Sequence, residues 1–442
     1  MGHVRADCRK PALSGPLVRR SISACLAQGP RASGRVAAAA CDHVIDGVGR
    51  GAAHRLQTVD DALQRAQRLM AQWDEELRRE LPEGAEIFDA HTHLGTDIDG
   101  MVGVYEDLER GMDKYGISRC FMFCLDEPDR HPGSRAGNDR TLDYAARSGG
   151  RMIPFVRLDL TEDPIGEARR CLDLGARGIK LHPRAQKFLL DDARLSPIFE
   201  LAGERNVPVL IHGGRGLPPI ADDLARVFDR YPKAQLIVAH AGIADLAALA
   251  HSLGGKAGVF FDTSVWSPLD LLGLYRLVGP EQVVYASDYP YGQQPASLLI
   301  ALRTARLAQF DEGQVRGVLT RNANRIADGE PPVEPSAPKG IDTFQQPMTF
   351  ARIHQYLSMA TPLLWTRQPD RIGVLGLALN ACDDRSNGHR EELEQIRELL
   401  STALDMWRAL PEEGDEKDRM AHTRATFRLI HLADIVAVTT PA

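Results

Sequence analysis

Short apolar runs recur along the middle of the chain, and longer amphipathic segments separate them. The runs have the length and the content of β-branched and aromatic residues that are typical of buried strands. We count eight predicted strands, at 86–91, 118–125, 151–160, 175–182, 207–213, 234–240, 258–264 and 282–289.

Helical spacing of apolar residues predicts helices between these strands. The clearest lie at 105–116, 138–149, 164–175, 196–206 and 220–232, and several close with Gly or Asn, as helix C-termini do. Alternation of eight strands with helices is typical of a (β/α)₈ TIM barrel in the α/β class. A doubly wound open sheet is the alternative, but no Gly-rich nucleotide fingerprint supports it.

The barrel pattern occupies residues 85–328, and its flanks have a different composition. Residues 1–57 are rich in Ala, Arg and Gly, and we expect them to be disordered or to follow from a start codon assigned too far upstream. The pattern of residues 58–84 predicts one helix, with Thr58 as its N-cap. A Pro-rich linker at 329–340 leads to a helical appendage at 341–442. We expect helices at 391–410 and 422–438 there, either docked on the barrel or used in assembly, which leaves a homo-oligomer open.

Composition indicates a globular protein with a small-molecule substrate. Of the 442 residues 43% are hydrophobic and 26% are charged, and the net charge of -7 gives no reason to expect nucleic-acid binding. No apolar run approaches the roughly 20 residues that span a membrane. The seven cysteines lack CxxC spacing, which argues against a disulfide framework or a cysteine metal site and favours the cytoplasm.

Polar residues with metal-binding capacity recur where the predicted strands end. In a barrel these ends surround one mouth, and strand residues two apart point to the same side. One HxH pair alone is a weak signal, but burying the whole set without a partner would cost several kcal/mol, and a shared cation removes that cost. The set comprises His91, His93, Lys180, His182, His212, His240 and Asp288.

The motifs "DAHTH", "GIKLHP", "LIHGG", "VAHAG" and "ASDYPYG" occur in this order. Together they resemble the amidohydrolase superfamily, in the amidohydrolase-related branch that includes aminocarboxymuconate-semialdehyde and resorcylate-type decarboxylases. The resemblance covers about residues 86–328. It implies that His91, His93, His212 and Asp288 hold a divalent metal, zinc or a similar ion, with one ion favoured over two. It also implies catalytic roles for Asp288 as proton acceptor and for His240 as an acid, a base or a ligand of a second ion.

Lys180 leaves two interpretations open. In binuclear members of the family a lysine at a comparable place is carboxylated and bridges two ions. As a free ammonium, which we favour, Lys180 would instead meet a substrate carboxylate. His182 could supply a further metal ligand or bind substrate.

Other residues near the predicted mouth bear on the substrate. Arg157, Arg184 and Arg215 lie on predicted loops at this face, and arginine suits bidentate recognition of carboxylates. They favour a carboxylated substrate. Asp262 ends the seventh strand and Trp266 follows it, and they form either a pocket wall or a helix N-cap and a packing aromatic residue.

The sequence therefore predicts a metal-dependent hydrolase that uses an activated water to cleave a C–N or C–O bond of a small, carboxylated organic molecule. A nonoxidative decarboxylase with the same metal site is the first alternative. A catalytically silent barrel that serves as a binding scaffold is the second.

Overall fold

One sheet of nine strands organises the chain. The computed structural model describes residues 61–339, 344–366, 368–370, 372–384, 388–409 and 416–440, so the predicted extension at 1–57 and the N-cap Thr58 lie outside the described residues. All neighbouring strands pair in parallel except β1 and β2. The strands are β1 (Ile87–Thr96), β2 (Val102–Gly103), β3 (Ile117–Cys124), β4 (Met152–Arg157), β5 (Gly178–Leu181), β6 (Val209–Ile211), β7 (Leu236–Val238), β8 (Val259–Asp262) and β9 (Val283–Val284).

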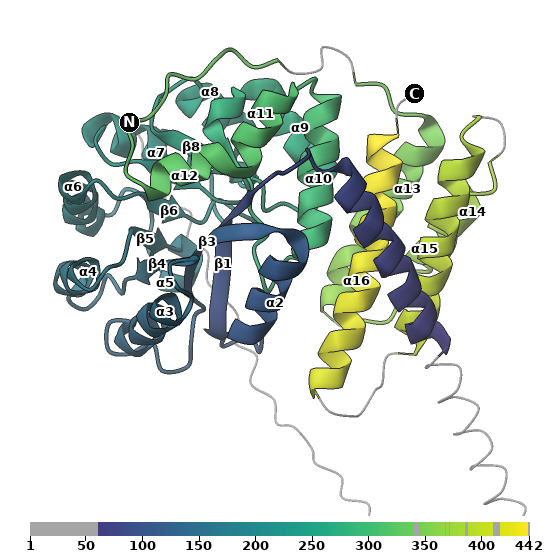
Figure 1. Cartoon of the computed structure of the whole chain (residues 1–442), viewed down its shortest axis with the longest axis horizontal. Helices are drawn as coiled ribbons and strands as arrows, with labels where there is room; N and C mark the ends of the chain where they lie inside the picture. Colours follow the sequence, from purple (N-terminus) through teal and green to yellow (C-terminus); the bar gives the residue numbers. More distant parts are fainter. Residues whose placement is uncertain are drawn as a thin grey trace, which may run out of the picture. The chain divides into compact units, whose positions relative to one another are not determined.

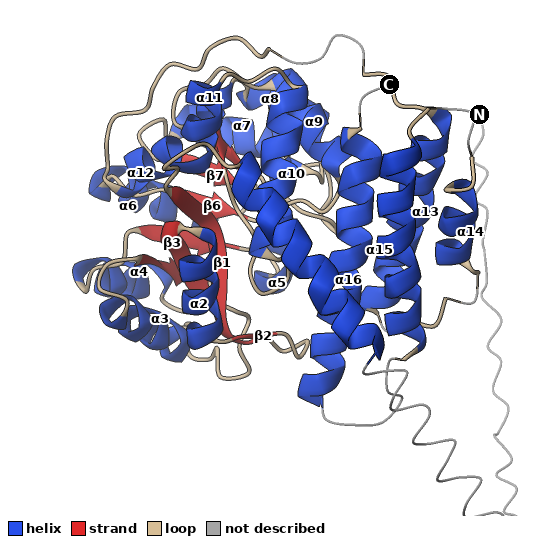
Figure 2. Ribbon diagram, turned by 45° about the vertical axis from the view of Figure 1, so that its right-hand side comes forward, coloured by secondary structure: helices blue, strands red, loops and turns tan. Residues whose placement is uncertain are grey.

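The sheet closes on itself because the segment after β9 returns to β1. The Ala90 amide donates to the Tyr285 carbonyl at 2.8 Å, and the His93 amide donates to the Tyr289 carbonyl at 2.7 Å. Thr92 and Tyr289 also form a parallel bridge. Parallel strands that close in sequence order, with helices outside them, make a TIM barrel (Figure 2), which confirms the predicted fold class.

All eight predicted strands are present, but each predicted boundary differs from the observed one by one to five residues. β1 does not end at His91, because it pairs with β3 as far as Leu94 and with the short strand β2 at Gly95 and Thr96. His182 lies just beyond β5, which ends at Leu181. The last predicted strand keeps regular pairing with β8 only over β9, because the residues after it turn to bond with β1.

Helices surround the sheet (Figure 1), and each of the five predicted barrel helices is present. Gly116 and Asn206 end two of them in the left-handed conformation. The α-helices are α2 (Tyr105–Tyr115), α3 (Arg135–Arg147), α4 (Pro164–Asp173), α5 (Pro183–Gln186), α6 (Ser196–Arg205), α7 (Ala221–Arg230), α8 (Leu246–Leu253), α9 (Pro268–Leu277), α10 (Gln294–Leu307), α11 (Glu312–Arg316) and α12 (Asn322–Ala327). Shorter helical segments are η1 (Ala193–Leu195), η2 (His240–Gly242), η3 (Pro280–Gln282) and η4 (Gly317–Arg321).

Two apolar clusters form the core. Inside the barrel, the rings of Phe88 and Phe121 lie 4.7 Å apart and those of Phe121 and Phe155 lie 4.5 Å apart. The second, larger cluster fills the space between the strands and the surrounding helices and continues into the C-terminal helices. The barrel interior is therefore packed with side chains below the mouth, and the space for chemistry lies above this layer.

Four C-terminal helices pack beside the barrel: α13 (Met348–Trp365), α14 (Val374–Ala381), α15 (Arg390–Arg408) and α16 (Glu416–Thr439). The sequence predicts only the last two. Helix α16 packs on α13, α15 and α10, and Gln293 of the barrel donates to the Arg424 carbonyl at 2.7 Å. This part of the chain is therefore docked on the barrel (Figure 1). None of the described helices has the length and apolar character needed to cross a bilayer.

A buried ion pair joins the helix at 61–80 to α16. Asp74 bonds to the guanidinium of Arg428, and Lys114 Nζ lies 2.7 Å from its other oxygen. Burial opposes ionisation of Asp74, but Arg428 and Lys114 outweigh it and hold the pKa of Asp74 below its ordinary value of 3.8. The ion pair therefore contributes its full stabilisation at pH values above the ordinary pKa of 3.8. This contribution is lost as the pH falls through the lower pKa that Asp74 has in the folded protein.

We expect Asp74→Ala to lower the free energy of unfolding by about 3 kcal/mol at pH 7, because it leaves a buried guanidinium without its partner. Urea denaturation measures the change. Glu75→Ala, which removes a neighbouring exposed ion pair with Arg78, is the control and should change stability by less than about 0.5 kcal/mol. Equal effects of the two substitutions would contradict a structural role for the buried pair.

Candidate metal centre

A cavity of about 520 Å³ opens at the carboxyl ends of the strands. Its volume lies in the range typical of small-molecule sites. The structure brings all of the predicted site residues to this cavity, from elements spread over most of the barrel. They are His91, His93, Arg157, Lys180, His182, Arg184, His212, Arg215, His240, Trp266 and Asp288.

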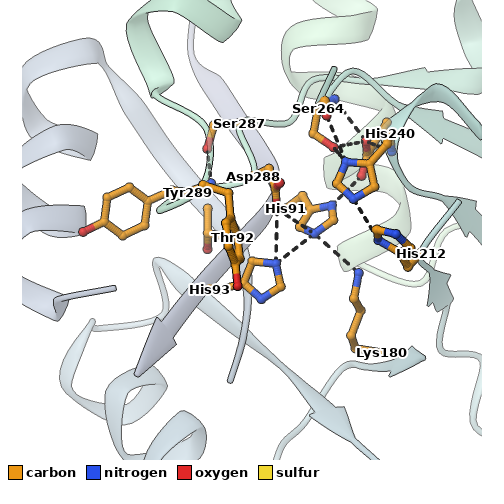
Figure 3. A network of polar contacts seen from close by, with 12 residues as sticks. His91, Thr92, His93, Lys180, His212, His240, Ser264, Ser287, Asp288 and Tyr289 are labelled. Atoms are coloured by element: carbon orange, nitrogen blue, oxygen red, sulfur yellow. Dashed lines mark hydrogen bonds and ion pairs between the residues drawn. The ribbon is translucent and has the colours of Figure 1, made fainter. Parts of the chain in front are cut away.

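Three ligand atoms converge at the cavity floor (Figure 3). His91 Nε2 and His93 Nε2 lie 3.1 Å apart, and Asp288 Oδ1 lies 3.3 Å and 3.2 Å from them. Atoms bound at about 2.1 Å around a tetrahedral ion would lie about 3.4 Å apart. The three residues are buried. Their spacing and chemistry therefore fit a divalent cation.

Hydrogen bonding orients the His91 ring for such a role. Its Nδ1 lies 2.7 Å from Asp262 Oδ2, and because a carboxylate oxygen accepts, Nδ1 carries the proton. That tautomer leaves a lone pair on His91 Nε2, facing His93. Two lone pairs 3.1 Å apart repel each other unless a cation or a proton lies between them.

The same reasoning applies to His212 and His240. His240 Nδ1 lies 2.9 Å from the Ser264 carbonyl, which can only accept, so His240 carries its proton there. His240 Nε2 then accepts from His212 Nδ1 at 3.0 Å. His212 consequently keeps a lone pair on Nε2, as a metal ligand requires.

An irregularity in β1 turns the first two histidines inward. Ala90 belongs to the apolar cluster inside the barrel, so strict alternation would turn His91 outward. The register of β1 against β3 shifts within residues 89–92. Beyond the shift, the rings of His91 and His93 pack on Phe123 at 5.1 Å and 4.4 Å. Bulges of this kind re-aim side chains next to functional sites.

Asp288 and His240 both have left-handed backbone conformations, with φ of 58° at each. For residues other than glycine this conformation costs on the order of 1 kcal/mol or more and persists only where the surroundings enforce it. Asp89 supplies part of that constraint, because its carboxylate accepts from the Ser287 amide at 2.8 Å and from the Ser287 hydroxyl at 2.6 Å. The backbone thus holds Asp288 against His91 and His93.

Burial controls the charge of the site. It lowers the pKa of His91, His93 and His212, so these imidazoles are neutral at physiological pH, as metal ligands must be. Burial alone would raise the pKa of Asp288, but its contacts with His91, His240 and His93 hold the pKa below its ordinary value. The floor therefore combines neutral nitrogens with an ionised carboxylate.

Two buried cations adjoin this floor. Lys180 Nζ lies 3.4 Å from His91 Nε2, and burial lowers the pKa of Lys180 to about 7, an effect that Asp262 and Asp288 partly offset. Arg157 is 4% exposed, and its Nη2 has no hydrogen-bond partner among the described residues. The same nitrogen lies 3.7 Å from Asp126 Oδ1, an ion pair that is too long for a hydrogen bond, so a donor remains available to an anionic ligand in the cavity.

The remaining residues support the site from its edges. His182 stacks on His212 at 3.8 Å, and its Nδ1 accepts from the Ala185 amide as the N-cap of α5. Asp262 is neither a helix cap nor part of the cavity lining, because it lies behind His91 and also accepts from the His240 amide at 2.7 Å. Trp266 does line the cavity, as one of the two interpretations predicted.

Sequence reasoning missed several cavity residues. Asp126 lies in the loop after a predicted strand, so its position offered a signal. Asp270 belongs to α9, and Trp365 ends α13, far along the chain from every motif. No local pattern distinguishes Trp365 from an ordinary apolar residue of a helix.

Comparison with known proteins gives one family match within the barrel. Residues 123–326 match the family model described as Amidohydrolase. The match confirms the resemblance seen in the motifs. It begins after His91 and His93 and ends before the C-terminal helices.

Solved structures give similar barrels at low identity. The 5-carboxyvanillate decarboxylase LigW from Sphingomonas paucimobilis is 18% identical, with a TM-score of 0.45 over 55% of this chain and 99% of that one. A dihydroxybenzoic acid decarboxylase from Polaromonas sp., with bound manganese, is 16% identical, with a TM-score of 0.45 over 55% and 97%. A probable 2-pyrone-4,6-dicarboxylic acid hydrolase from Acinetobacter baumannii is 13% identical, with a TM-score of 0.43 over 55% and 99%. These likenesses do not decide the reaction of this chain.

We expect Asp262→Asn to weaken metal binding by roughly 10- to 100-fold, because the carboxylate that fixes the His91 tautomer is lost. Competition with a chelator, with zinc and then manganese as the metal, measures the affinity. Asp270→Asn removes a carboxylate that lines the same cavity from α9 and should leave the affinity unchanged. Unchanged affinity in Asp262→Asn would show that Asp262 does not orient a ligand.

Proposed function

We propose that this protein is a metal-dependent hydrolase that cleaves a C–N or C–O bond of a small carboxylated molecule. The observation that carries the proposal is the convergence of His91, His93 and Asp288 beside His212 at a cavity floor. Two buried cations in the same cavity support the carboxylated substrate.

The donor set favours a single divalent ion. Imidazole and carboxylate ligands suit zinc and manganese. His212 lies outside the group of three whose ligand atoms are within 4.8 Å of one another, so it would have to move closer to complete the set with its Nε2 lone pair. Among the described residues, the other group with metal-ligand spacing is the partly exposed set His131, Asp159 and Glu162. A bound divalent cation supplies Lewis acidity, which makes a water molecule a stronger acid and polarises a carbonyl group.

The chain's own residues then move protons. Asp288 reaches the cavity floor as an ionised carboxylate, so it can accept a proton from water and pass it to the leaving group. His240, held through Nδ1 by Ser264, is our candidate for the acid or base that serves the substrate carbonyl oxygen, a role in which its Nε2 exchanges the bond with His212 for one with the substrate.

Substrate binding falls to the cationic residues. Arg157 Nη2 pairs with Asp126 at 3.7 Å without a hydrogen bond, so it can still donate to a carboxylate, and Lys180, which binding of an anion would favour in its charged form, lies next to His91. We therefore favour an unmodified Lys180 over a carboxylated bridge between two ions. Arg184 and Arg215 line the cavity as well and extend its positive charge.

A nonoxidative decarboxylase is the second candidate, and the position of Lys180 favours it. Its Nζ lies 3.4 Å from a proposed metal ligand, so a carboxylate bound to Lys180 would lie beside the metal. In that arrangement the substrate carboxylate is the reacting group, whereas in the hydrolase it serves only to bind the substrate.

Protein purified without added metal should contain about one divalent ion per chain by ICP mass spectrometry. His93→Ala and Asp288→Asn should lose the ion and reduce activity by at least about 1,000-fold while the circular dichroism spectrum is retained. His131→Ala, which disrupts the exposed group, is the matched control and should keep the ion. Full activity after chelation, with no stimulation by added metal, would refute the metal-dependent reaction.

Product analysis distinguishes the two reactions. Once a carboxylated substrate is found by screening, hydrolysis in ¹⁸O-labelled water should place one labelled oxygen in the product and release no CO₂. In a parallel reaction in D₂O, release of CO₂ with incorporation of one deuterium into the product would establish the decarboxylase instead. The metal requirement should hold in both cases, so the result tests the reaction type separately from the metal site.

A further inference from the structure

We propose that the C-terminal helices form one wall of the active-site cavity and that Trp365 selects substrates with a flat apolar group. The inference rests on the proposed function, which assigns a carboxylate to one end of the substrate. It adds that the other end is a flat apolar group. Trp365 lies outside residues 123–326, so the family match does not describe this wall.

Three aromatic rings from separate parts of the chain form the wall. Trp266 lies in the loop between β8 and α9, Trp365 ends α13, and Phe427 lies in α16. The ring centroids of Trp266 and Trp365 are 5.5 Å apart, and each lies 5.4 Å from Phe427. Both indoles line the cavity that contains the candidate metal ligands, whereas Phe427 is buried behind them. These distances are those of favourable aromatic packing.

Polar contacts fix the wall in place. His431 Nε2 lies 2.7 Å from the Trp266 carbonyl, and because that oxygen only accepts, His431 donates. His431 is buried, which disfavours its charged form, and a neutral imidazole is sufficient to donate this bond. His354 of α13 lies 2.7 Å from Asp434 of α16 and ties together the two helices that carry Trp365 and Phe427. Contacts between the barrel and these helices therefore hold the wall in a fixed position at the cavity.

The cavity has two chemically different parts. Arg157, Lys180 and the candidate metal ligands provide charge, whereas Val265, Trp266 and Trp365 provide apolar surface. An indole ring offers a large, rigid surface on which a flat ring stacks with little loss of entropy. A substrate with a carboxylate and a flat apolar group matches both parts, and a small aliphatic acid matches only one.

The preference of this wall for a flat apolar group can be tested by calorimetry, which measures the binding of three probes to the metal-loaded full chain. The probes are 1-naphthoate, which has both features, acetate, which has only the carboxylate, and 2-naphthol, which has only the flat ring. We expect Trp365→Leu to weaken binding of both naphthyl probes by roughly tenfold and that of acetate by less than about twofold. Trp365→Phe, which keeps a ring, should restore most of the naphthyl affinity.

Trp73→Ala is the matched control, because Trp73 is also a half-buried tryptophan on a helix outside the barrel and does not line the cavity. It should leave all three affinities unchanged. The inference is wrong if Trp365→Leu binds naphthyl probes as tightly as the unsubstituted protein, or if the unsubstituted protein binds neither of them.

The probes also separate this inference from the proposed function. Protein that holds no metal and binds no acetate would refute the proposed function, whereas 2-naphthol needs neither the cations nor the metal and still reports on Trp365. Conversely, normal metal content and acetate binding, with no effect of Trp365→Leu on 2-naphthol, would refute only the aromatic wall.

Discussion

The approach of two neutral imidazoles, His91 and His93, with Nε2 atoms 3.1 Å apart in a buried place, is the constraint on which the site depends. A cation or a proton between the two nitrogens relieves the repulsion of their lone pairs, and several features of the backbone produce this close approach. The register shift in β1 turns both rings inward, and the return of the chain from β9 to β1 brings Asp288 beside them. Behind the site, Asp262 fixes the proton of His91 on the far nitrogen.

The cavity above this floor joins two parts of the chain with different roles. The barrel supplies the candidate ligands and the cations, and its left-handed residues Asp288 and His240 show that the backbone accepts strain to place them. The C-terminal helices supply Trp365 and support Trp266 through His431. The barrel alone would leave that side of the cavity without these contacts, so the helices enlarge the apolar part of the cavity wall.

Much of the fold could be predicted because its signals are local. Each strand is a short apolar run, and helices such as α2 end at residues suited to the left-handed conformation, such as Gly116. Errors arose where pairing is not local, as at the far end of β1, which depends on β2. Helix α13 does carry helical spacing in its buried residues, including Phe350, Ile353 and Leu357, but Pro362 lies within it and weakens the pattern.

The sequence by itself determined which residue types stand at the strand ends, and therefore that imidazoles, a carboxylate and basic side chains would meet at one mouth. Only the tertiary structure decided the inward turn of His91, the tautomers set by Asp262 and Ser264, and the entry of Trp365 into the cavity. The physical reason is that strand and helix periodicity is encoded within a few neighbouring residues. Tautomers and cavity walls instead depend on contacts between residues far apart in the chain, which form only when the elements pack.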